Sequence, residues 1–138
     1  MQFLGQLLIY PTLGGRSDTG SYVTHANAPM LNAQDMQYYH EARFGGQLPA
    51  AYDTAMGVLH DTDFSGLPPT YIMTAGCDPL RDDGMHYAAK IEAAGGDVEW
   101  DDAPGLVHGC LRGRTSSRAI AAAYDKILAA LKGFTAAA

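Results

Sequence analysis

Basic residues, long apolar runs and cysteines are all scarce in this 138-residue sequence. Nine lysines and arginines stand against 15 aspartates and glutamates, a formal net charge of -6, and nucleic-acid backbones and anionic membranes repel such a chain. We therefore expect no nucleic-acid partner and no membrane partner. No apolar run approaches the roughly 20 residues that span a bilayer, and the start MQFLGQLLIYP lacks the basic stretch and cleavage site of a signal peptide. Without either segment the chain is expected to be cytoplasmic, and two cysteines that form no disulfide framework agree with that location.

Signatures of metal and nucleotide sites are missing as well. Four of the five histidines have no ligand spacing such as H-x-x-x-H: His25, His40, His60 and His86. The glycine pairs at 14–15 and 95–96 lack the G-x-G-x-x-G fingerprint and are typical of turns and helix ends. We therefore predict no metal and no cofactor.

What the sequence does contain is enough apolar surface for one core, with a regular alternation of elements. At 47% hydrophobic content, residues 1–138 form a single domain or part of a larger one. Short β-rich apolar runs predict strands at 6–10 and 70–74, and the alternation of Val98 and Trp100 with acids predicts a shorter, more exposed edge strand.

Helices are predicted between and after these strands. Asn32 caps the first, with Asp35 at the third position and an end near Gly45, and the second follows in RDDGMHYAAKIEAAGG. Ser116 or Ser117 caps the third, which ends before Gly133. Its predicted apolar face consists of Ile120, Ala123, Tyr124, Ile127, Leu128 and Leu131. Residues 46–69 are expected to be an irregular connection with one short helical turn around 51–56.

This order predicts the α/β class, a three-layer αβα arrangement with a short, mainly parallel sheet whose functional groups gather beyond the carboxyl ends of the strands. Asp78 and His108 follow two neighbouring strands and fall at that edge. An acid and a histidine there can form the relay of a nucleophilic triad. The alternative is structural, with Asp78 initiating a turn before Pro79 and His108 a solvated loop residue.

Three segments together resemble the α/β-hydrolase family, specifically the hormone-sensitive-lipase-like bacterial esterases: GQLLIYP, SGLPPTYIMTAGCDPLRDDGMHYAAKIEAAGGDVEW and GLVHGC. The likeness covers nearly the whole chain and implies the carboxyl-terminal half of that fold. By resemblance, the aspartate of DPLRD, Asp78, is the triad acid, and the histidine of the HG pair, His108, is the base. Most relatives carry an aromatic residue after HG, where this chain has Cys110, a difference that concerns the shape of the pocket.

The nucleophile of that family is not found in these residues. Such hydrolases present serine in G-x-S-x-G before the acid and base, and the nearest stretch, GRSDT around Ser17, lacks the closing glycine and a following helix. Cys110 is interpreted as a small buried residue rather than a thiolate nucleophile. Asp82 and Asp83 are expected to favour the start of their helix, with Asp82 also a possible partner of Asp78.

Two function hypotheses follow. One is a carboxylic-ester hydrolase of short acyl esters, in which a serine from outside this segment completes the triad. The other is a catalytically silent assembly or interaction module. In either case the unpaired edge of the first strand is expected to cause self-association, or to require a complementing amino-terminal chain.

Overall fold

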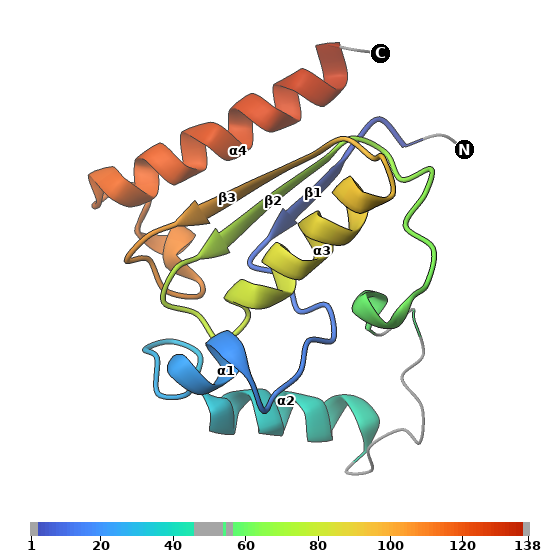
Figure 1. Cartoon of the computed structure of the whole chain (residues 1–138). Coiled ribbons are helices and arrows are strands. Elements are labelled where there is room, and N and C mark those ends of the chain that lie inside the picture. The colour runs from blue at the N-terminus through green and yellow to red at the C-terminus, as the bar shows by residue number, and fades with distance from the viewer. Residues whose placement is uncertain (1–2, 46–53, 55–56, 137–138) are drawn as a thin grey trace.

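The structure is a computed structural model that describes residues 3–45, 54 and 57–136. Strands and helices alternate along the chain (Figure 1). The strands are β1 (Gln6–Ile9), β2 (Thr70–Ala75) and β3 (Val98–Ala103). The α-helices are α1 (Gly20–Thr24), α2 (Ala33–Phe44), α3 (Arg81–Ala93) and α4 (Arg118–Ala136), and the 3-10 helices are η1 (Val58–His60) and η2 (Cys110–Gly113).

The three strands form one parallel sheet in the order β1-β2-β3, which confirms the predicted α/β class. Gln6 lies opposite Thr70, and Thr70 lies opposite Val98, so the three carboxyl ends meet at one edge. β3 is an edge strand of this sheet, as predicted, but it is as long as β2 rather than shorter. Two acids near its end have charged partners: Lys126 contacts Asp101 at 2.6 Å, and Arg81 contacts Asp102.

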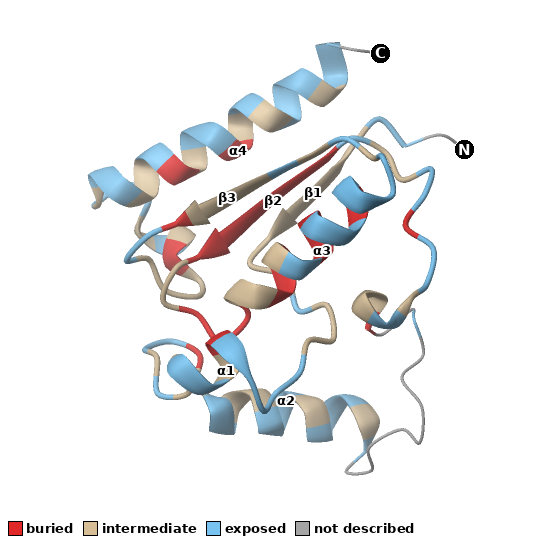
Figure 2. Ribbon diagram, viewed as in Figure 1, coloured by how far each residue is buried: buried red, intermediate tan, exposed pale blue. Residues whose placement is uncertain are grey.

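Helices cover both faces of the sheet, with α3 on one side and α4 on the other (Figure 1). All six residues of β2 are buried, and the strand is a continuous line of buried residues in Figure 2. Because side chains alternate along a strand, Tyr71 and Met73 join the cluster under α4, whereas Ile72 joins the cluster under α3. β2 therefore supplies the centre of both layers.

The apolar face of α4 differs from the prediction. The helix passes through Gly133 to Ala136, and its core-facing residues recur at helical spacing. They are Ile120, Ala123, Ile127, Ala130 and Phe134. Leu131, which was predicted on this face, is 49% exposed. The face extends further because Gly5, ahead of β1, leaves the space that the ring of Phe134 occupies.

The start of α2 follows the prediction. Asn32 accepts a hydrogen bond from the backbone of Asp35, Asp35 accepts one from the backbone of Asn32, and Gly45 ends the helix at φ 64°. No residue of α2 is buried, and the capping box fixes where the helix begins. The helical turn expected around 51–56 falls outside the described residues apart from Thr54. None of the helices within the described ranges is long and apolar enough to cross a membrane.

Candidate active site

The carboxyl edge of the sheet brings the two sequence-predicted residues together. Asp78 lies three residues beyond the end of β2 and is fully buried, and His108 lies in the loop after β3. The Nδ1 atom of His108 is 2.7 Å from Oδ2 of Asp78. The other carboxylate oxygen, Oδ1, accepts a hydrogen bond from the backbone N–H of Leu80 at 2.9 Å. Both oxygens of the buried acid therefore have a partner, as a buried charge requires.

Backbone hydrogen bonds hold the two loops side by side. Gly76 donates to the carbonyl of Ala103 at 2.8 Å, and Cys77 donates to the carbonyl of Leu106, also at 2.8 Å. At position 76 a side chain would meet the backbone of Pro104 and Ala103 at 3.0–3.1 Å, so glycine allows this close approach. The acid turn thus continues the pairing of β2 with β3 beyond the strands themselves.

The imidazole of His108 is held from a second side by an aromatic ring. The rings of Tyr10 and His108 have centroids 4.6 Å apart and a 58° interplanar angle. Tyr10 directly follows β1 and has φ 34°, an uncommon conformation for a residue other than glycine. A carboxylate at Nδ1 fixes the proton on that atom, so Nε2 is the nitrogen that can accept a proton.

Cys110 does not have the surroundings of a reactive thiolate. It is buried, and burial raises the pKa of its thiol, with the negative charge of Asp78 acting in the same direction. A raised pKa keeps the thiol protonated and weakly nucleophilic at neutral pH. Burial likewise raises the pKa of Tyr10, so its phenol is neutral beside the imidazole.

Ser17, the weak nucleophile candidate, lies exposed in a turn between β1 and α1. Among the described contacts, no hydrogen bond joins it to His108. Ser21 lies closer to the acid turn, but its hydroxyl donates to the carbonyl of Pro79 at 2.6 Å and accepts from the backbone of Asp82. With donor and acceptor both engaged, Ser21 fixes structure.

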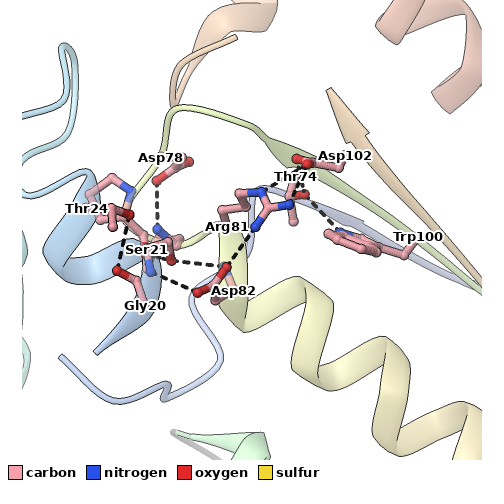
Figure 3. Close-up of polar contacts among 11 residues, drawn as sticks. Gly20, Ser21, Thr24, Thr74, Asp78, Arg81, Asp82, Trp100 and Asp102 are labelled. Atoms are coloured by element: carbon pink, nitrogen blue, oxygen red, sulfur yellow. Dashed lines mark hydrogen bonds and ion pairs between the residues drawn. The ribbon is translucent and has the colours of Figure 1, made fainter. Parts of the chain in front are cut away.

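Asp82 and Asp83 do more than favour the start of α3. One oxygen of Asp83 accepts hydrogen bonds from the backbone of Leu13 and Gly15 and from the hydroxyl of Tyr22. Asp82 accepts one from the backbone of Ser21 and pairs with Arg81 (Figure 3). Neither makes a described contact with Asp78, so the partnership considered for Asp82 is not seen. Apart from Arg81, their partners lie 61 to 70 residues away in sequence, and no local signal could have revealed them.

A cleft of about 450 Å³ opens beside the acid turn. Its walls come from α1, the start of α3 and the loops after β2 and β3. Its charged side chains are Arg81, Asp82 and Asp102, with His25 at one side. Within the part of the chain that the structure describes, no group of three or more His, Cys, Asp or Glu side chains is placed to hold a metal ion.

This geometry is that of an α/β fold with an acid and a histidine at the carboxyl edge of a parallel sheet, and comparison with known proteins gives the same class. A family model described as alpha/beta hydrolase fold matches residues 1–112, and the chain belongs to this family. The resemblance to hormone-sensitive-lipase-like esterases drawn from the sequence is thereby confirmed.

Two of the following three similar proteins are named as esterases. Carboxylesterase NlhH of Mycobacterium tuberculosis is 38% identical over an alignment of 133 positions that covers 92% of this chain and 40% of that protein. The crystal structure of DphMB1 superposes with a TM-score of 0.90 at 31% identity, covering 96% of this chain and 44% of that one. A thermostable esterase from Pseudomonas putida ECU1011 gives 0.81 at 27% identity, covering 92% and 41%. The chain thus spans about 40% of the length of the relatives it matches and covers part of their fold.

Proposed function

We propose that this chain supplies the acid and the base of a serine carboxylesterase, with Asp78 orienting His108 and His108 acting as general base and then general acid. The observation that supports the proposal is the 2.7 Å contact between Nδ1 of His108 and a fully buried carboxylate. The names of the relatives, a carboxylesterase and an esterase, support ester hydrolysis as the reaction.

In the proposed reaction, Nε2 of His108 takes the proton of a serine hydroxyl as the serine oxygen attacks the ester carbonyl. The resulting imidazolium gives that proton to the departing alcohol, which leaves an acyl-serine. Water then repeats the sequence and releases the carboxylic acid. Asp78 stabilises the imidazolium at both steps because its charge, shielded from solvent, faces Nδ1. No cofactor takes part.

The serine and the oxyanion-hole donors are the parts that these 138 residues do not present in recognisable form. We propose that they come from residues outside this sequence, either in the same polypeptide or in a complementing chain. The substrates are short acyl esters, and the cytoplasmic location remains a prediction.

A hybrid protein tests this proposal. In carboxylesterase NlhH, the segment that matches this chain is replaced by residues 1–138, and hydrolysis of p-nitrophenyl acetate and butyrate is measured. We expect turnover that Asp78→Asn lowers by about 10⁴-fold and His108→Ala by about 10⁶-fold, because the base itself is lost only in the second variant. His86→Ala, at an exposed histidine of α3, is the matched control and should leave the rate unchanged.

A folded hybrid that keeps its turnover after His108→Ala would contradict the proposed roles. The isolated 138-residue chain is expected to hydrolyse the same esters no faster than imidazole buffer does, because its sequence contains no G-x-S-x-G elbow to present a serine. Turnover by the pure chain, abolished by His108→Ala, would place the nucleophile within these residues.

A second candidate, an assembly module, is favoured by the surface around β1. In the described part of the sheet β1 pairs only with β2, and the N–H groups of Gln6 and Tyr10 point toward the β2 side. By alternation, the N–H groups of Leu7 and Ile9 face the free edge, ready to pair with another strand. Phe3, which lies three residues before β1, is 64% exposed and adds apolar surface next to this edge.

We propose that this edge pairs with a second copy of the chain in a two-fold dimer, or with a complementing amino-terminal chain. Size-exclusion chromatography with light scattering should give the mass of a dimer at micromolar concentration. Combining Phe3→Lys with Leu4→Lys should reduce it to a monomer, whereas Leu131→Lys, an equally exposed position on α4, should not. A monomeric unmodified chain would contradict the dimer.

A further inference from the structure

Arg81 connects the two loops that carry the acid and the histidine. Its Nε and Nη2 atoms contact Oδ2 of Asp102 at 2.9 Å and 2.8 Å, and its Nη1 atom contacts Oδ1 of Asp82 at 3.0 Å. Figure 3 shows the guanidinium lying between the two carboxylates, one on α3 and the other on β3. All three of its nitrogens therefore have partners.

Arg81 and Asp102 lie close in sequence to the acid and to the histidine, respectively. Arg81 is three residues after Asp78, and its backbone N–H donates to the carbonyl of Asp78 at 3.1 Å. Asp102 lies near the end of β3, six residues before His108. The Arg81–Asp102 pair thus ties the turn that carries the acid to the strand that leads to the base.

Further contacts fix each end of the pair. Oδ1 of Asp102 accepts a hydrogen bond from the hydroxyl of Thr74 at 3.3 Å, and the hydroxyl of Thr74 accepts one from the indole N–H of Trp100 at 2.9 Å. The guanidinium lies over the Trp100 ring, 5.5 Å from its centroid. The side chains of Arg81 and Asp102 are 29% and 27% exposed, so solvent screens this pair less than a fully exposed one.

The opposite side of the acid turn is tied down as well. Oδ2 of Asp82 accepts a hydrogen bond from the backbone N–H of Ser21 at 2.8 Å. The hydroxyl of Ser21 in turn donates to the carbonyl of Pro79, the residue after Asp78. The charged walls of the cleft beside the turn are therefore bonded to one another rather than directed toward a ligand. This arrangement indicates a brace for the turn instead of a second binding site.

We propose that Arg81 is a positioning residue that, through Asp102, holds the acid turn against the histidine loop so that Asp78 meets Nδ1 of His108. The proposal rests on the proposed function of these two residues. The backbone bonds of Gly76 and Cys77 set the distance between the loops, and Arg81 fixes the turn at the residues that follow the acid. An error of about 1 Å there would break the relay.

The test observes the Asp78–His108 contact directly in the full 138-residue chain. A hydrogen-bonded Nδ1 proton gives a resolved low-field NMR signal, and its exchange with solvent reports how often the contact opens. We expect Arg81→Gln and Asp102→Asn to speed that exchange by about tenfold, the change produced when opening becomes roughly 1.4 kcal/mol easier. Arg81→Lys keeps the charge but loses the planar fork, and should give an intermediate rate.

Lys126→Gln is the matched control. It removes the ion pair between Lys126 and Asp101 at the same end of β3, a pair that does not involve the acid turn, so the exchange rate should stay the same. Spectra are recorded where circular dichroism shows each variant folded, which separates positioning from loss of stability. If Arg81→Gln does not fold, Asp102→Asn decides, because it leaves Arg81 paired with Asp82.

A folded Asp102→Asn or Arg81→Gln variant with the unmodified exchange rate would overturn the proposal. The measurement needs neither a serine nor ester turnover. Failure of the proposed function would appear as hybrid turnover that does not depend on His108, whereas failure of the brace would appear only as an unchanged Nδ1 signal.

Discussion

Gly84 decides how closely α3 can approach β2, and replacing it with alanine tests the packing beneath the acid turn. A Cβ atom at position 84 would overlap the Cγ2 methyl of Thr74 and lie 3.0 Å from that of Ile72. Both neighbours are 0% exposed. Thr74 cannot simply rotate away, because its hydroxyl is engaged with Trp100 and Asp102.

The expected magnitude is a difference of two effects. Alanine is a better helix former than glycine by about 1 kcal/mol, which alone would stabilise α3. Inserting a methyl group into a well-packed core costs about 1–3 kcal/mol, and more where the neighbours are rigid. Because both neighbours are held rigidly, the upper part of that range, about 2–3 kcal/mol, applies here. Gly84→Ala should therefore lower the free energy of unfolding by about 1–2 kcal/mol, a fall in Tm of roughly 3–10 °C for a chain of this size.

The same substitution elsewhere supplies the control. Gly133 is also inside a helix, but a Cβ atom there meets no atom within 4 Å. Gly133→Ala should raise the free energy of unfolding by up to about 1 kcal/mol through helix propensity alone. Urea and thermal unfolding, followed by circular dichroism, measure both variants. If Gly84→Ala proved as stable as the parent, or shifted Tm in the same direction as Gly133→Ala, the packing argument would be refuted.

Three further predictions concern single groups. Burial raises the pKa of Asp83 more than its hydrogen bonds from Leu13, Gly15 and Tyr22 lower it. As pH rises, the unfolded chain therefore releases this proton before the folded chain does. The contribution of the protonated carboxyl to the free energy of unfolding is lost as pH rises from about 4 toward the raised pKa. Asp83→Asn should remove that decline in urea unfolding followed across pH, and an unchanged pH dependence would count against it. Tyr10→Phe should leave the His108 ring signals sharp in NMR spectra, whereas Tyr10→Gly, which removes the ring, should broaden them; equal spectra would argue against the aromatic contact. Asn32→Ala should cost α2 about 1 kcal/mol through its lost capping box, visible as faster amide exchange in the first turn, with little change in Tm because α2 buries no residue; a large fall in Tm would contradict this.

Much of the fold was predictable because its signals are local. The strands at 6–10 and 70–74 were placed to within a residue, since a buried parallel strand is a short apolar run between turn residues. The capping box of α2 was placed on both of its residues, because it depends only on a spacing of three. Where the local signal was weaker, as at the end of β3 and beyond Gly133, the predicted boundary was wrong because contacts between elements set it.

The short helices show where local signals end. α1 has five residues and carries no periodic pattern. Its position is fixed by the hydrogen bonds of Ser21 with Asp82 and Pro79, which lie about sixty residues later in the sequence. In the same way, the acids at 82 and 83 were expected to act on their own helix, whereas their hydrogen bonds bind the segment that follows β1. Such partners are chosen by the fold and leave no pattern in the sequence.

By itself the sequence determined the α/β class, the strands and main helices, and the placement of Asp78 and His108 at the carboxyl ends of neighbouring strands, because apolar periodicity and turn residues act over a few positions. Only the tertiary structure decided that the two side chains lie 2.7 Å apart, that Arg81 links their loops through Asp102, and that Tyr10 packs on the imidazole. These contacts join residues 21 to 98 positions apart, and such distances are set when the helices pack on the sheet.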